Sequence, residues 1–167
     1  MRQADRFKCS GTAAVRASTC ECLDDRLGAQ CLQAHGATAC TDLTGFGLLG
    51  HLVEMTRPSG VDAELYLAAL PLLDGALETS AAGILSSLQP ANVRLRRALR
   101  NQAEAISHPA YPLIFDPQTA GGLLATVPAA KADACIAALR KLGYGKTVAI
   151  GRILPQGDAL EPILLRC

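Results

Sequence analysis

The segment Thr41-Asp42-Leu43-Thr44-Gly45-Phe46-Gly47 combines residue types that bind phosphate and a divalent metal ion. Its two glycines let backbone N–H groups approach an anion, and a helix that begins behind them would add the positive end of its dipole. A carboxylate such as Asp42 can hold a magnesium ion that bridges phosphates. The pattern is therefore typical of a loop that binds phosphate and magnesium.

The same residues also fit a purely structural role. Asp42 or Thr44 can cap the helix expected to begin near Phe46, because short oxygen-bearing side chains satisfy the free N–H groups of a first helical turn. His51 lies one turn into that helix, where a single histidine is more often a packed or surface residue than a catalytic one. The pattern alone leaves capping and metal binding equally open.

A second glycine-rich segment, Asp116-Pro117-Gln118-Thr119-Ala120-Gly121-Gly122, precedes an apolar stretch. A proline followed by two glycines indicates a tight turn that needs unusual backbone angles, and this is the interpretation that the residues favour. The alternative is that the segment forms a second polar wall of the same site.

Other catalytic patterns are absent from the sequence. It contains no G-x-x-x-x-G-K phosphate loop and no nucleophile elbow, so an independent nucleotidase or hydrolase is not indicated. Seven cysteines form an odd set without the spacing of a secreted disulfide framework, which favours reduced thiols. Cys9, Cys20 and Cys22 lack the second ligand pair of a zinc site, so zinc is not favoured.

Composition excludes several classes of partner. The 167 residues contain 16 Lys and Arg against 15 Asp and Glu, for a formal net charge of +1, and there is no Trp. Without a broad basic surface or stacking aromatic residues, nucleic-acid binding is not expected, and the arginines at 94, 96, 97 and 100 are interpreted as a solvated face. No apolar run approaches the ~20 residues of a membrane span. We expect a cytoplasmic protein, since no secretory signal begins the sequence.

Periodicity predicts the elements that hold the first segment in place. Apolar residues at helical spacing predict a helix from Leu23 to His35, followed by a short strand at 37–41. A helix is expected after Gly47 and should end before Pro58, because proline disfavours continuation. Alternating residues then predict a strand at 61–67 with one buried and one wetter face.

The second half predicts two helices, at 72–82 and 91–106, before its strands. Residues 111–115 and 123–127 are expected as strands, a helix should run from Pro128 to Gly143, and closing strands are expected at 148–154 and 163–165. This mixed order, with hairpin-like neighbours near the end, predicts an α+β fold: a layered domain with helices on a mixed sheet. Residues 1–22 show no periodicity and are expected to be a poorly ordered leader to a domain at 23–167.

Two long motifs resemble those of the selenophosphate synthetase (selenide, water dikinase) C-terminal domain. They are T-D-L-T-G-F-G-L-L-G-H at Thr41 to His51 and D-P-Q-T-A-G-G-L-L at Asp116 to Leu124. The family commonly has Ser at the position of Ala120. The resemblance runs from about Leu23 to the end and implies the C-terminal fold that selenophosphate synthetases share with aminoimidazole ribonucleotide synthetase.

The resemblance also implies an activity that this sequence does not hold alone. The family uses ATP, selenide and water to form selenophosphate, AMP and phosphate, with Mg²⁺ required. Asp42 matches the family's metal-binding aspartate. The matching residues expected around the phosphate are Thr41, Thr44, Gly45 and Gly47. The family's glycine-rich segment with a reactive Cys or selenocysteine and a Lys has no counterpart here, so no catalytic residue is assigned and the chain is expected to be inactive alone.

The implied partners are ATP and selenide in a complete enzyme, an N-terminal synthetase domain or an oxidoreductase domain, and a second copy in a homodimer. Two other hypotheses remain. One is a non-catalytic module that binds a nucleotide or a protein, or a relic of the enzyme. The other is a purine-pathway cyclo-ligase, whose corresponding loop typically reads T-G-G-G; Phe46 and the D-P-Q-T stretch count against it.

Overall fold

A single six-stranded sheet forms the centre of the computed structural model, which describes residues 12–17, 25–119 and 121–167. Its strands are β1 (Thr12–Ala17), β2 (Ala39–Asp42), β3 (Val61–Tyr66), β4 (Leu123–Pro128), β5 (Val148–Pro155) and β6 (Ile163–Arg166). The order across the sheet is β2-β4-β1-β5-β3-β6. Neighbouring strands are antiparallel except β3 and β6, which are parallel. The expected α+β class with a mixed sheet is confirmed.

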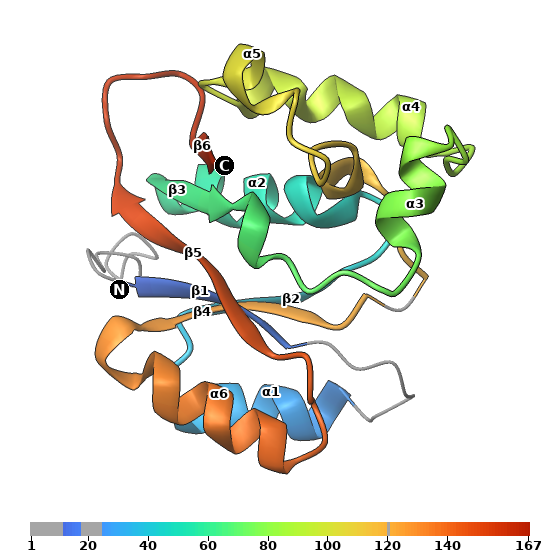
Figure 1. The fold of residues 1–167 in the computed structure, drawn as a ribbon. Coiled ribbons are helices and arrows are strands. Elements are labelled where there is room, and N and C mark those ends of the chain that lie inside the picture. The colour runs from blue at the N-terminus through green and yellow to red at the C-terminus, as the bar shows by residue number, and fades with distance from the viewer. Residues whose placement is uncertain (1–11, 18–24, 120) are drawn as a thin grey trace.

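Helices cover both faces of the sheet (Figure 1). The α-helices are α1 (Asp25–Ala34), α2 (Gly47–Ser59), α3 (Ala76–Ala81), α4 (Gln89–Asn92), α5 (Gln102–Ala105) and α6 (Ala132–Lys141). Short 3₁₀ helices are η2 (Leu67–Ala69), η3 (Val93–Ala98), η4 (Pro112–Phe115) and η5 (Ala129–Lys131). Figure 1 shows α1 and α6 side by side on one face, and α2 with the segment from α3 to α5 on the other.

Strand β4 separates two hydrophobic cores because its successive side chains point to opposite faces. Leu124 packs into the larger core, where α2 contributes Leu48, Leu49 and Leu52. Its neighbour Leu123 packs into the smaller core under α1 and α6. The first glycine-rich segment joins β2 to α2, so its two ends are fixed by the sheet and by the larger core.

Strand β1 corrects the expectation that residues 1–22 form a leader outside the domain. Thr12–Ala17 lies between β4 and β5 and pairs with both: Thr12 is opposite Pro128 on one side and Ile153 on the other. The sequence Thr-Ala-Ala-Val-Arg-Ala has no alternation of apolar and polar residues, so periodicity could not identify it. Residues 1–11 and 18–22 lie outside the described residues.

Three further expectations were wrong in detail. Residues 112–115 form the 3₁₀ helix η4 instead of a strand, with Pro112 in its first turn. The helix expected at 91–106 is interrupted, because Leu99 bridges to Ile163 and the Arg100 N–H donates to the Ile163 carbonyl. The expected hairpin at the end is absent from the described sheet, where β5 and β6 each pair with β3.

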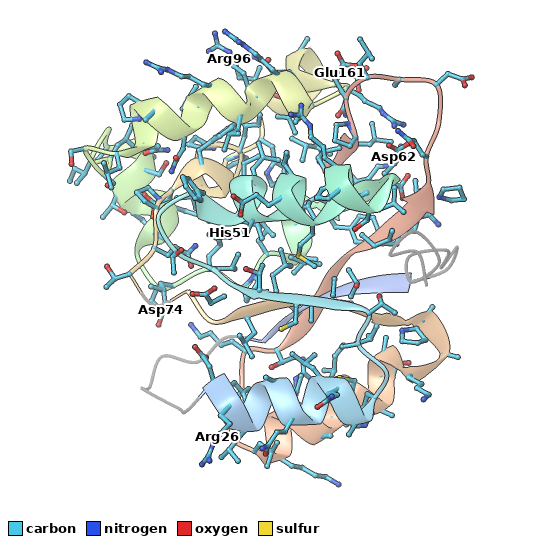
Figure 2. All side chains as sticks on the ribbon, turned by 180° about the vertical axis from the view of Figure 1, so that it is seen from behind. Arg26, His51, Asp62, Asp74, Arg96 and Glu161 are labelled. Carbon is cyan, nitrogen blue, oxygen red and sulfur yellow. The ribbon has the colours of Figure 1, made fainter. Side chains whose placement is uncertain are left out.

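The face of β3 that the sequence predicted to be wetter carries two buried carboxylates. Glu64 is bound by Arg152 and Arg166, and Asp62 is bound by Arg100 and accepts the Gly157 N–H at 2.8 Å. Buried charges are tolerated when they are paired in this way. Arg96 is exposed and points away from the molecule, as the predicted solvated face requires (Figure 2), whereas Arg100 of the same cluster binds the buried Asp62 instead.

Candidate functional site

The first glycine-rich segment bends sharply between β2 and α2. Thr41 and Asp42 are the last residues of β2, and α2 begins at Gly47. Gly47 has a φ of +69°, and a Cβ there would lie 2.9 Å from the Asp116 carbonyl oxygen. Only glycine combines this backbone angle with such a close approach, so Gly47 is required for the loop to reach the second segment.

Backbone hydrogen bonds join the two glycine-rich segments into one structure, which we call the two-motif wall (residues 41–47 and 116–122). The Leu43 N–H donates to the Gly122 carbonyl at 2.9 Å, and the Gly121 N–H donates back to the Leu43 carbonyl at 3.0 Å. A third bond runs from the Gln118 N–H to the Thr44 carbonyl at 3.1 Å. The residues joined by these bonds lie 74–79 positions apart in the sequence, and folding makes them neighbours.

The glycines of the second segment serve this contact. A Cβ on Gly121 would lie 2.8 Å from both the Cβ and the carbonyl oxygen of Leu43, and Gly122 has a φ of +77°. The turn with unusual backbone angles and the second wall are therefore the same feature, and the two interpretations of the sequence do not compete. Ala120 lies outside the described residues.

Asn92 locks the wall from the side of α4. Its Nδ2 donates to the Gly45 carbonyl at 2.8 Å and to the Phe115 carbonyl at 3.0 Å, and the side chain is buried. One amide thus binds a residue of the first glycine-rich segment and the residue that precedes the second. Sequence reasoning gave Asn92 no role, because nothing in its local pattern indicates a partner 47 residues away.

His51 holds the first segment from within its own helix. The residue lies on α2 (Figure 2) and is 95% buried. Its Nε2 accepts the Thr44 N–H at 3.1 Å and lies 3.3 Å from the Thr44 Oγ1. Since Nε2 accepts an N–H, the ring proton is on Nδ1, which lies 3.4 Å from the Glu54 carboxylate without good hydrogen-bond alignment. His51 is a packed residue, the more common case for a lone helical histidine.

The capping alternative for Asp42 and Thr44 is wrong. Phe46 occupies the N-cap position of α2, and the cap has no side-chain hydrogen bond. The Thr44 hydroxyl faces His51, and the Asp42 side chain is exposed at the end of the edge strand β2. The carboxylate of Asp42 is therefore available to a ligand and is not used to begin the helix.

Asp42 would supply one carboxylate to a metal site and no more. Among the described residues there is no cluster of three or more histidine, cysteine or acidic side chains that could hold a metal ion. Magnesium is commonly held by one or two carboxylates together with phosphate oxygens and water, so an exposed single aspartate fits this ion when ATP supplies the phosphates. The remaining protein ligands would come from another part of a complete site.

A cavity of about 360 Å³ borders the second segment. Leucines and prolines from residues 70–73, 113 and 117 form most of its wall, with Asp116, Gln118 and Thr119 as the polar side. Burial raises the pKa of the Asp116 carboxyl above its ordinary value. The cavity places an apolar recess directly beside the two-motif wall.

The described cysteines do not form a metal site. Cys31, Cys40, Cys135 and Cys167 are free thiols, and burial raises the pKa of Cys135 to about 11. Cys9, Cys20 and Cys22, which were considered for zinc, lie outside the described residues. Among the described helices, none has both the length and the apolar character needed to cross a membrane.

Comparison with known proteins supports the family resemblance. The family described as "AIR synthase related protein, C-terminal domain" matches residues 5–160. A selenide, water dikinase of Paraburkholderia xenovorans is 34% identical over 159 residues, which are 95% of this chain and 44% of that protein. The Geobacter metallireducens protein of the same name is 42% identical over 123 residues, 71% of this chain and 34% of that protein. The chain thus spans less than half the length of these relatives.

Solved structures share the fold at low sequence identity. The hydrogenase maturation protein HypE superposes with a TM-score of 0.65 at 16% identity, over 98% of this chain and 51% of that one. The match of the family to residues 5–160 also includes most of the segment expected to be a leader. The resemblance to selenide, water dikinases that the two motifs indicated is confirmed.

Proposed function

We propose that the chain, which belongs to the family "AIR synthase related protein, C-terminal domain", acts as the C-terminal domain of a selenide, water dikinase. The complete enzyme would convert ATP, selenide and water into selenophosphate, AMP and phosphate. In this proposal the chain contributes the two-motif wall, and a second polypeptide or domain contributes the residues that perform the chemistry.

One observation carries the proposal: the two-motif wall leaves the Asp42 carboxylate exposed. Three backbone hydrogen bonds and the Asn92 amide hold the loop, while the Asp42 side chain makes no described hydrogen bond or ion pair. A carboxylate presented on a rigid loop is what a metal site needs, because the loop does not have to reorganise when the ion binds.

The residues of the first segment have different roles in the proposed site. Asp42 would bind Mg²⁺, which when bound offsets the negative charge of the phosphates of ATP. Gly45 is exposed, with no atom within 4 Å of a Cβ built on it, so its backbone is open to phosphate. Gly47 and Thr44 face inward, toward Asp116 and His51, and would shape the loop. Thr41 donates its hydroxyl to the Asp42 carbonyl and would steady the aspartate.

No residue of the chain is assigned to the transfer of the phosphoryl group. We therefore expect the chain alone to release no AMP from ATP and selenide, and to require an N-terminal synthetase domain. The proposal also includes a homodimer, an oxidoreductase domain as the alternative partner, and a cytoplasmic location, as the family resemblance implies.

A chimeric enzyme tests the proposal. The part of the Paraburkholderia xenovorans relative that matches this chain is replaced by residues 1–167, and AMP release is measured with selenide and Mg²⁺. We expect Asp42→Asn to lower turnover at least about 100-fold at low Mg²⁺ and to leave the melting temperature of the chain nearly unchanged, because the residue is exposed.

Asp158→Asn is the matched control, since Asp158 is also exposed but lies in the loop before β6. Equal turnover in the two variants would contradict the metal role of Asp42. A chimera that folds but releases no selenide-dependent AMP would contradict the proposed function itself.

A further inference from the structure

Helix α3 is an element without a buried face. None of its six residues is buried, and the segment that contains it, Leu73–Leu88, has five large apolar side chains exposed. Their exposed fractions are 62% for Leu73, 39% for Leu77, 68% for Ile84, 51% for Leu85 and 58% for Leu88. A helix normally buries its apolar stripe, and clustered exposed apolar side chains mark interaction surfaces. We call Leu73–Leu88 the apolar segment.

The apolar segment lies beside the two-motif wall. Leu73 and Ala76 line the same cavity as Asp116 and Thr119 of the second motif. At its other end, Leu88 directly precedes α4, whose Asn92 binds the Gly45 carbonyl. Figure 1 shows α3 and α4 at the end of the molecule where α2 begins, so the apolar segment and the proposed metal loop open to the same side.

A further apolar side chain stands on the wall itself. Phe46, in the first glycine-rich segment, is 55% exposed although it is a large aromatic residue. Six of the ten exposed large apolar side chains in the described part of the chain are thus Phe46 and the five in the apolar segment. Isolated exposed apolar residues need no explanation, but five within residues 73–88, together with Phe46 on the neighbouring wall, do.

The charge of this surface limits its partner. The apolar segment contains Asp74 and Glu78 and no Lys, Arg or His, and the neighbouring wall adds Asp42 and Asp116. Asp74 is fully exposed at the surface (Figure 2), and its carboxylate lies 3.8 Å from the Lys146 ammonium group. A partner surface with apolar residues and Lys or Arg would complement it, whereas a second copy of this chain would bring like charges together.

We propose that the apolar segment and Phe46 form the docking surface for the polypeptide that completes the proposed metal and phosphate site. This inference rests on the proposed function. The occupant is the N-terminal part of a selenide, water dikinase, with apolar residues flanked by Lys or Arg at the contact. The two relatives described above are long enough to contain such a part, since the match to this chain covers only 34–44% of their length. The segment adjoins the loop whose missing ligands that part must supply.

Hydrogen–deuterium exchange tests the docking surface. Exchange of peptides that cover residues 73–88 is measured in this chain alone and in the chimera with the Paraburkholderia xenovorans relative. We expect exchange to be at least about tenfold slower in the chimera, because docking covers α3 and its hydrogen bonds. Exchange is also measured in the aligned segment of the intact relative. The test therefore does not depend on how well the chimera folds.

Paired substitutions identify the side chains involved. Leu77→Asp with Leu85→Asp should restore fast exchange in the chimera and lower AMP release at least about tenfold, with little change in the melting temperature of the chain alone. Leu160→Asp is the control, since Leu160 is 91% exposed in the loop before β6. The proposal is supported if exchange is slow in both the chimera and the relative, and if in the chimera the paired substitutions restore fast exchange while Leu160→Asp does not.

Other outcomes overturn it. Fast exchange in the active chimera and in the relative would refute the docking surface and leave the proposed function intact. Slow exchange in a chimera that makes no AMP would refute the proposed function and leave the docking surface intact. If the chain alone sediments as a dimer that Leu77→Asp with Leu85→Asp dissociates, the occupant is a second copy and the proposal is wrong.

Discussion

The contact between the two glycine-rich segments predicts that alanine at Gly47 strongly lowers the stability of the chain, whereas alanine at Gly45 hardly changes it. In Gly47→Ala, an alanine at a φ of +69° costs about 1–2 kcal/mol in backbone strain. The new Cβ would also lie 2.9 Å from the Asp116 carbonyl oxygen, so the wall must open. Weakening one or two of its hydrogen bonds costs about 0.5–1.5 kcal/mol each. We expect a total loss of about 1.5–5 kcal/mol.

Thermal unfolding followed by circular dichroism measures this loss. For a chain of this size, 1 kcal/mol lowers the melting temperature by about 2–4 °C, so Gly47→Ala should melt roughly 3–20 °C below the unaltered chain. Gly45→Ala is the matched control, because Gly45 is exposed, lacks a positive φ and has open space around its Cβ position. Its melting temperature should change by less than about 2 °C.

Gly45→Ala and Gly47→Ala also separate the effect of a substitution on the shape of the loop from its effect on phosphate binding. In the chimera, Gly45→Ala should lower AMP release while stability is kept, since the added methyl group occupies space proposed for phosphate. A Gly47→Ala chain that melts within about 2 °C of the unaltered chain would refute the close contact between the two segments. Equal destabilisation by both substitutions would refute the assignment of Gly45 to an open position.

Two further predictions concern buried polar groups. Asn92→Asp should lower the free energy of unfolding in urea by about 2–4 kcal/mol, because a carboxylate would face the carbonyl oxygens of Gly45 and Phe115; an unchanged midpoint would contradict the bridging role. Hydrogen bonds from Arg152, then from Arg166, hold the pKa of Glu64 below its ordinary value of 4.5 against the effect of burial. A depressed folded-state pKa stabilises the protein above the unfolded-state pKa, and this stabilisation is lost as pH falls through the folded value. The unaltered chain should therefore lose more stability between pH 6 and pH 3 than Glu64→Gln, and equal losses would show that the ion pairs do not matter.

The motifs themselves were predictable because local spacing carries their information. Glycines at 45, 47, 121 and 122 indicate loops that approach another backbone closely, and the short strand expected before the first loop, at 37–41, corresponds to β2. The sequence could not show that the two loops touch each other, since the bonds between them join residues far apart along the chain. The roles of Asn92 and His51 were missed or left open for the same reason.

The errors in the fold have a common physical cause. Residues 111–115 have strand-like composition, but they end as a 3₁₀ helix packed with Ile114 and Phe115 in the larger core. The helix expected through Leu99 is broken because β6 offers the backbone there a parallel partner. In both places tertiary contacts outweighed local preference, which is usually worth less than about 1 kcal/mol per residue.

The central position of β1 has a consequence for biosynthesis. β1 ends at Ala17, whereas its partners in the sheet, β4 and β5, begin at Leu123 and Val148 and are therefore synthesised much later than β1. Until those strands are made, β1 lacks a neighbour on both sides, and its exposed peptide groups can pair with another nascent chain. Closure of this sheet is therefore a late, long-range event, and a chaperone that holds the nascent chain should raise the yield of folded protein more than one that acts only after release.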